Sequence, residues 1–163
     1  MKVYVASPLG FSDVGGPYRR RIRNALTKAG HVVLDPWDLP PELARSLKDA
    51  LRLPLSGEQQ ERLADLNIEL GQRNARLIDE CDALFAVLDG ADVDSGTASE
   101  IGYAAGLKKR IVGLRTDFRL AGDNIGSRVN LQVEFFIHMS EGGLEKGLAQ
   151  AVARLTAAGS RVL

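Results

Sequence analysis

The strongest constraint on the fold is an unbroken apolar run, Ala83–Leu88 (ALFAVL), followed at once by the acidic sequence DGADVD. A strand with one face in water alternates apolar and polar residues, whereas a strand covered on both faces is apolar throughout. Six consecutive apolar residues before a polar loop are therefore typical of a central strand in a parallel sheet with helices on both faces.

Segments of strand and helix character alternate along the rest of the chain. The expected strands are Lys2–Ala6, His31–Leu34, Ala83–Leu88, Arg110–Leu114 and Leu131–Ile137, and the expected helices are Pro17–Ala29, Glu58–Asp79, Thr97–Leu107 and Glu141–Ala158. We expect Trp37–Ser56 to be irregular, with one or two helical turns around Glu42–Arg52, and Thr116–Asn130 to be a loop. This order predicts a single α/β domain, residues 1–163, with a doubly wound, mostly parallel sheet of about five strands, of the flavodoxin or Rossmann type.

Composition narrows the class of partner. The 21 Lys and Arg residues balance 21 Asp and Glu residues, so nothing favours nucleic acid or a membrane surface as a partner. Cys81 is the single cysteine and His31 and His138 are far apart, which argues against a disulfide framework and a protein-bound metal. With no signal-peptide pattern or membrane-length apolar run, we expect a cytoplasmic protein.

The predicted sheet sorts the polar residues by position. In such sheets, ligands bind beyond the carboxyl ends of the strands. Four segments follow strands and are expected at this edge: Ser7–Gly16, Asp35–Asp38, Asp89–Ser99 and Thr116–Asn130. Trp37 lies here too and could stack on a base or simply pack at the rim. Asp82 precedes a strand, which places it at the opposite edge as a turn or cap residue.

The loop after the central strand carries the most informative pattern. Asp94 lies six residues before Glu100, and Gly96 between them leaves room for a ligand. If Ser95 or Thr97 caps the helix, Glu100 lies in its first turn, where the helix dipole would keep it ionised. A plain capping box is an equally good interpretation. Two carboxyl groups, one ionised and one with a raised pKa, are what glycosidic-bond chemistry requires.

The stretch CDALFAVLDGADVDSGTASEIGYAAGLKKRIVGLRTDFR resembles the nucleoside 2-deoxyribosyltransferases, as do VYVASPLGFSD and VNLQVEFF. The resemblance covers most of the chain, and its most specific part is the spacing of Asp94, Glu100, Gly102 and Tyr103. It implies a glutamate nucleophile, Glu100, that captures C1′ of a 2′-deoxynucleoside until a second base arrives. It implies that Asp94 exchanges a proton with the base and that no cofactor is needed.

The same resemblance implies the substrate-binding residues. Tyr4 and Phe11 match positions that orient the nucleophile and cover the substrate. Asn130 and Gln132 match the place where a neighbouring subunit contacts the sugar hydroxyls, which implies a homodimer or larger homo-oligomer. Asn74 aligns with a second family aspartate and can orient a base without accepting its proton.

Three alternatives remain open. A nucleoside or nucleotide N-glycosidase of the same fold uses water instead of a second base and often has serine where Asp94 stands; Asp94 favours free nucleosides, because it would repel a 5′-phosphate. Gly96-Thr97-x-x-Glu100 is similar to part of the motif of cytokinin-activating phosphoribohydrolases, although their preceding double glycine is absent. A non-catalytic nucleoside-binding module is the third, and the Asp94–Glu100 pair argues against it.

Overall fold

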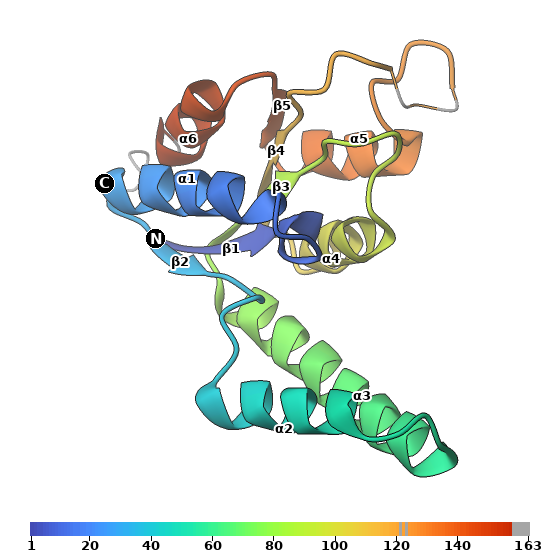
Figure 1. Ribbon diagram of the computed structural model, residues 1–163. Helices are drawn as coiled ribbons and strands as arrows, with labels where there is room; N and C mark the ends of the chain where they lie inside the picture. Colours follow the sequence, from blue (N-terminus) through green and yellow to red (C-terminus); the bar gives the residue numbers. More distant parts are fainter. Residues whose placement is uncertain (121, 123, 158–163) are drawn as a thin grey trace.

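The computed structural model describes residues 1–120, 122 and 124–157. Its elements, in chain order, are β1 (Lys2–Ala6), a short 3-10 turn (Pro8–Gly10), α1 (Gly15–Lys28), β2 (Val32–Leu34), α2 (Pro41–Arg52), α3 (Gly57–Glu80), β3 (Ala83–Val87), α4 (Ser95–Gly106), β4 (Arg110–Leu114), α5 (Leu131–Met139), β5 (Gly143–Glu145) and α6 (Leu148–Ala157). The described strands form one sheet in the order β2-β1-β3-β4-β5, with every neighbouring pair parallel (Figure 1). This arrangement is the flavodoxin-like α/β fold that the sequence predicts.

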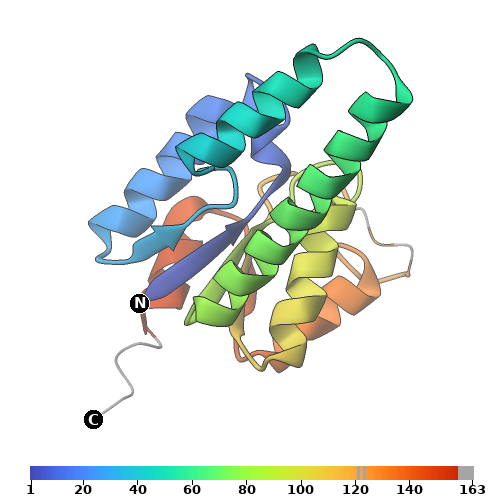
Figure 2. The ribbon, with the colours of Figure 1, turned by 90° about the horizontal axis from the view of Figure 1, so that it is seen from below.

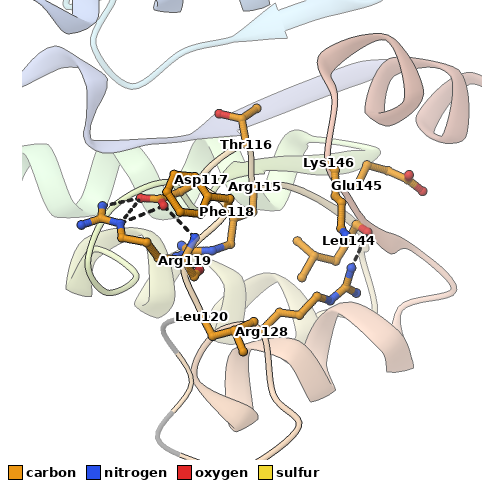
Figure 3. A pocket seen from close by; sticks show the side chains of 10 residues that line it. All are labelled: Arg115, Thr116, Asp117, Phe118, Arg119, Leu120, Arg128, Leu144, Glu145 and Lys146. Atoms are coloured by element: carbon orange, nitrogen blue, oxygen red, sulfur yellow. Dashed lines mark hydrogen bonds and ion pairs between the residues drawn. The ribbon is translucent and has the colours of Figure 1, made fainter.

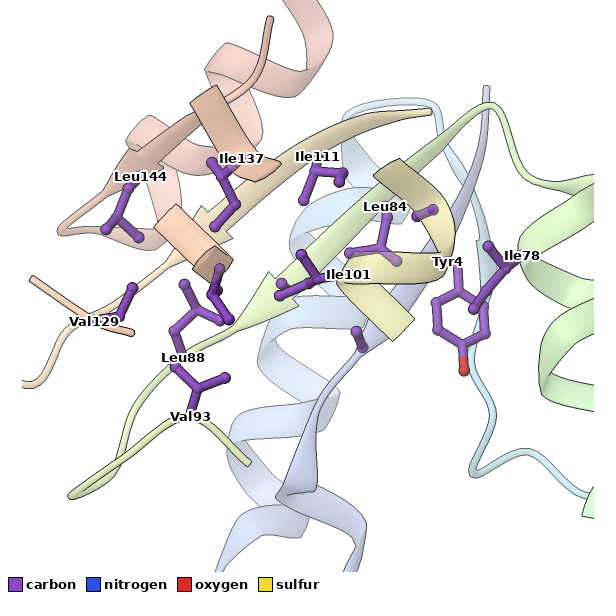
Figure 4. Close-up of a cluster of buried hydrophobic side chains, with 14 of the residues drawn as sticks. Tyr4, Ile78, Leu84, Leu88, Val93, Ile101, Ile111, Val129, Ile137 and Leu144 are labelled. Carbon is purple, nitrogen blue, oxygen red and sulfur yellow. The ribbon is translucent and has the colours of Figure 1, made fainter. Parts of the chain in front are cut away.

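The central position of β3 explains its unbroken apolar sequence. Residues 83, 85 and 87 pack on one face of the sheet with α1 and α6, where Leu26 and Leu155 are fully buried. Residues 84, 86 and 88 pack on the other face with α4 and α5, among Ile101 and Ile137 (Figure 4). Both faces of β3 are therefore in the core, as the parallel-sheet interpretation requires.

The C-terminal third differs from the sequence prediction. The predicted strand at residues 131–137 is helix α5, and the fifth strand, β5, lies inside the stretch predicted as the closing helix. A short apolar run does not distinguish a buried helix from a strand. Asn130 starts the helix here, because its Oδ1 accepts hydrogen bonds from the backbone N–H groups of Gln132 and Val133. Residue 158, the predicted end of the closing helix, lies outside the described residues.

Gly142 lets the chain enter β5. A Cβ atom at this residue would lie 1.6 Å from the carbonyl oxygen of Ile111. We expect Gly142→Ala to lower the free energy of unfolding by about 1–3 kcal/mol, the usual cost of overpacking. Gly71→Ala, on the open face of α3, is the matched control and should raise it by about 0.5–1 kcal/mol, because glycine weakens a helix. Urea denaturation of both variants measures this difference, and equal stabilities would contradict the assignment.

The segment predicted to be mostly irregular is instead a regular helix, α2, which forms a hairpin with α3 that extends away from the sheet (Figures 1 and 2). Leu43, Ala50 and Leu66 are the buried centre of this hairpin. The side-chain amide of Gln59 donates to the carbonyl oxygens of Ala50 and Leu53 at 3.2 and 2.8 Å, which closes the end of α2. Tertiary pairing of leucines thus stabilises a helix whose proline-rich surroundings suggest a loop.

Within the described part of the chain, no helix is long and apolar enough to cross a membrane.

Candidate active site

A cavity of about 360 Å³ lies at the carboxyl ends of β1 and β3, between α4 and the α2–α3 hairpin. Its lining residues are Ser7, Phe11, Pro36, Trp37, Leu39, Leu47, Asn67, Leu70, Asn74, Asp94, Gly96, Thr97 and Glu100. One end carries the two carboxyl groups that the sequence singles out, and the hairpin contributes two leucines and two asparagines, Leu47, Leu70, Asn67 and Asn74. The cavity therefore has an acidic end and an end that combines apolar and amide side chains.

Glu100 lies in the second turn of α4, not in the first turn as the sequence suggests, and it takes no part in a capping box. One carboxyl oxygen accepts a 2.6 Å hydrogen bond from the hydroxyl of Tyr4 on β1. Burial raises the pKa of Glu100 to about 7, the hydrogen bond from Tyr4 opposes this rise, and the charge of Asp94 adds to it. The sequence predicts that the helix dipole keeps Glu100 ionised, whereas burial acts in the opposite direction and is the largest influence on its pKa.

Asp94 is the residue that caps α4, in place of Ser95 or Thr97. Its Oδ2 accepts hydrogen bonds from the backbone N–H of Thr97 at 2.8 Å and from the Thr97 hydroxyl at 3.1 Å. Because both bonds go to the same oxygen, the cap holds the carboxyl group in place while its other oxygen remains for a ligand. Gly96 lines the cavity beside it, and a Cβ there would approach Asp94 Oδ2 to 3.2 Å.

The structure also places the other predicted binding residues. Tyr4 is fully buried beneath Glu100, and burial together with the adjacent carboxyl group raises its pKa far above the usual value. Phe11 lies at the cavity with 75% of its surface exposed. Asn74 reaches the cavity from α3, and its Oδ1 is buried without a hydrogen-bond partner. Asn130 and Gln132 lie at the start of α5 and do not line this cavity.

Several lining residues were not singled out individually by the sequence, although Ser7 lies in a segment expected at this edge. Ser7 directly follows β1, and its Oγ is buried without a partner. Leu39 and Leu47 come from the segment that the sequence predicts as mostly irregular, so their contribution depends on the hairpin. Leucines at helical spacing within that segment were the one available clue.

Trp37 packs at the rim, which is one of its two predicted roles, and it also lines the cavity. Stacking on a base stays a prediction. The indole N–H of Trp37 donates to the carbonyl oxygen of Ser7 at 3.0 Å, and its ring meets Phe11 edge-on with centroids 4.6 Å apart. A Cβ at Gly10 would lie 2.0 Å from the indole ring, so glycine is required for this approach. The aromatic pair therefore forms a fixed edge of the cavity.

Among the described residues, no group of three or more His, Cys, Asp and Glu side chains could hold a metal ion. The side chains of the cavity offer a buried carboxyl group with a raised pKa, a second carboxyl group beside it and a hydroxyl that donates to the first. This combination suits nucleophilic attack coupled to proton transfer.

Comparisons with known proteins identify the family and the fold. A search of curated proteins found no match. Among solved structures, the fold is similar to a 2-desoxiribosyltransferase from Leishmania mexicana (22% identity, TM-score 0.65, 99% of both chains covered) and a 2-deoxyribosyltransferase from Bacillus psychrosaccharolyticus (18%, 0.63, 93% of this chain and 90% of that one). A CMP N-glycosidase from Clostridium botulinum also shares the fold, with 16% identity, a TM-score of 0.55, and 95% of this chain and 98% of that one covered. The family model described as nucleoside 2-deoxyribosyltransferase matches residues 3–136, and the chain therefore belongs to this family.

Proposed function

We propose that the protein transfers the 2-deoxyribosyl group of a 2′-deoxynucleoside from one nucleobase to another, with retention at C1′. The observation that carries the proposal is the contact between Tyr4 and Glu100 at the acidic end of the cavity, with Asp94 adjoining. Tyr4 holds one oxygen of Glu100 and stabilises its ionised form, which leaves the second oxygen to act as the nucleophile.

The reaction proceeds in two displacements. The Glu100 carboxylate forms a bond to C1′ as the bond from C1′ to the base nitrogen breaks, and Asp94 donates a proton to the departing base. In the second step, the nitrogen of a new base attacks C1′, the ester bond to Glu100 breaks and Asp94 takes up the proton of the incoming base. Protons and charge balance over the cycle, and no cofactor enters it.

The charges around the cavity favour free nucleosides over nucleotides. The lining contains two carboxyl groups and no lysine or arginine. Arg73, from the same helix as Asn74, donates to the carbonyl oxygens of Pro36 and Asp38 at 3.0 and 2.7 Å. The N-terminus of α4, a natural phosphate site, is already capped by the Asp94 carboxyl group. A 5′-phosphate would meet negative charge here without a compensating cation.

The two ends of the cavity suit the two parts of the substrate. The leucines of the hairpin, with Trp37 and Phe11, provide an apolar, aromatic surface for the base. Asn74 Oδ1, buried and unpartnered, would accept a hydrogen bond from an N–H group of the base. Asn74 cannot take up a proton as an aspartate would, so proton transfer to and from the base depends on Asp94.

A hydrolase remains the second candidate, because Phe11 at the cavity is 75% exposed and water can reach the site. Incubation of the protein with deoxyinosine and adenine separates the functions. Formation of deoxyadenosine supports the transferase, free hypoxanthine alone supports an N-glycosidase, and binding without turnover supports a non-catalytic module.

The pKa of Glu100 predicts how the rate depends on pH. Only the carboxylate attacks C1′, so the rate should fall as the pH drops below about 7, the pKa that burial produces. Tyr4→Phe removes a hydrogen bond that stabilises the carboxylate, so the pKa rises further and the midpoint of this acid limb should move up by about one pH unit. Single-turnover rates between pH 5 and 9 (roughly two units either side of that pKa) measure the midpoint. An unchanged midpoint would show that Glu100 is not the titrating group.

We further propose that Asn130 and Gln132 complete the site of a neighbouring subunit, because neither lines the cavity of its own chain. Mixing two inactive variants, Glu100→Ala and Asn130→Asp, tests this. Aspartate can still cap α5 but lacks the amide N–H groups. In a two-fold dimer, one of the two sites in each hybrid carries neither change, so activity should recover to about a quarter of wild type. Verified subunit exchange without recovery would assign Asn130 to its own chain or to no site.

A further inference from the structure

A second cavity, of about 190 Å³, lies at the carboxyl ends of β4 and β5 (Figure 3). It is enclosed by residues 115–120 after β4, by Arg128 and by residues 144–146 at the end of β5. None of these residues lines the cavity that contains Glu100. The second cavity is therefore separate from the proposed active site, although both open at the same edge of the sheet.

Positive charge is in excess around this cavity. Its ionisable lining residues are four cations and two carboxylates: Arg115, Arg119, Arg128, Lys146, Asp117 and Glu145. Both carboxylates already have partners. Arg119 Nε donates to Asp117 Oδ1 at 2.9 Å, and Glu145 pairs with Arg154 on α6, which does not line the cavity. Figure 3 shows Arg128 on the opposite wall, reaching toward Leu144, whose carbonyl oxygen it contacts at 3.2 Å.

Arg115 is the unusual member of the group, because only 5% of its surface is exposed. Its terminal nitrogens donate to the carbonyl oxygens of Leu88, Gly90 and Arg119, which tie the loops after β3 and β4 together. Its Nε is buried without a partner, and no carboxylate in the described part of the chain lies within ion-pair distance of it. The charge of Arg115 helps to lower the pKa of the nearby Asp117 carboxyl group, but Asp117 makes its direct ion pair with Arg119. A bound anion would therefore give the buried guanidinium a partner of its own.

A purely structural role accounts for part of this arrangement only. The three carbonyl contacts explain why Arg115 is present, and Arg128 pairs with Glu134 on α5 at 3.2 Å. These contacts explain neither the unpartnered Nε of Arg115 nor the position of Lys146 beside the cavity. Leu120 and Leu144 contribute apolar surface to the same cavity. The site combines a guanidinium and an ammonium group with a small apolar wall, which suits an anionic group carried on a small organic molecule.

We propose that this cavity binds a phosphate dianion, supplied either as inorganic phosphate or as the phosphoryl group of a small phosphate ester. Arg115 and Lys146 are the principal cations of the site. Their unsatisfied charge, and not the shape of the cavity alone, selects a doubly charged ligand over chloride.

The test uses the full chain labelled with ¹⁵N. Inorganic phosphate and glycerol 3-phosphate are titrated separately at constant ionic strength, with sodium chloride as the reference, and amide shifts are followed at residues 116–120 and 144–146. We expect saturable shifts at these amides with at least one of the two phosphates and none with chloride. Lys146→Gln, an exposed substitution, should weaken binding about fivefold through loss of one charged contact. Lys28→Gln, at the end of α1, makes the same charge change elsewhere and should bind like wild type.

Each outcome decides the proposal. Tighter binding of glycerol 3-phosphate identifies an ester as the natural source, and tighter binding of inorganic phosphate identifies the free ion. Equal affinities in the Lys146→Gln and Lys28→Gln variants, shifts reproduced by chloride, or no saturable shift at these amides would overturn it. Arg115→Gln should abolish binding, but that variant can also lose the contacts that hold the loops together. The comparison of Lys146→Gln with Lys28→Gln is therefore the decisive test.

Discussion

Glu100→Gln should lower the rate of base exchange by at least about 10³-fold, because an amide cannot form the ester with C1′. The substitution keeps an oxygen that can accept the hydrogen bond from Tyr4, so the geometry of the site should survive. Steady-state rates with deoxyinosine and adenine measure the loss. In the wild type, a slow 2′-fluoro substrate should leave a sugar adduct on the peptide that contains Glu100, which mass spectrometry detects.

Stability provides the control for this variant. The pKa of Glu100 is about 7 in the folded protein against 4.5 for an ordinary glutamate, so the folded state binds its proton more tightly. Glu100 therefore does not lower the free energy of unfolding below about pH 4.5. Between pH 4.5 and about 7 its ionisation lowers that free energy progressively, and above about pH 7 the loss is complete. Glu100→Gln should thus melt at a higher temperature than wild type at about pH 8, one unit above that pKa, with a smaller difference near pH 5. Near-normal activity in a stable variant, or an adduct on another residue, would refute Glu100 as the nucleophile.

Asp94→Asn should slow exchange of bases that need protonation by about 10²–10⁴-fold, the usual contribution of general acid–base catalysis. Asparagine is as good a helix cap as aspartate, so α4 should still begin at the same residue and the loss should be chemical. Cleavage of a nitrophenyl 2-deoxyriboside, whose leaving group departs without a proton, should be little affected. The ratio of the two rates is the measurement.

Asp92→Asn is the matched control, because Asp92 lies two residues away in the same loop and contacts only the adjacent backbone N–H of Val93 among the described hydrogen bonds. It should leave both rates close to wild type. If Asp94→Asn kept both rates close to wild type, the carboxyl group of Asp94 would serve only to cap the helix. Equal losses on both substrates would mean that it is structural and does not transfer the proton.

The regular sheet was predictable because its signals are local. The bounds of β1 and β4 agree with the sequence prediction, and β3 ends one residue earlier than expected, since apolar and β-branched runs between breakers define such strands. The predictions of a strand at residues 131–137 and of a helix over residues 143–145 were wrong because the local sequence signals there are ambiguous. Nothing within Leu131–Met139 alone decides between helix and strand, and the cap by Asn130 together with packing against α4 decided it.

For the site, the sequence by itself identified the two carboxyl groups on which the proposed function rests. Asp94 and Glu100 follow a buried parallel strand, so the topology of the sheet places them at the edge where ligands bind, whatever the side-chain packing around them. The tertiary structure alone decided the state and surroundings of those groups. Burial raises the pKa of Glu100, and the α2–α3 hairpin brings Leu47 and Asn74 against the cavity. These properties depend on contacts between residues far apart in the chain, which spacing along a sequence does not record.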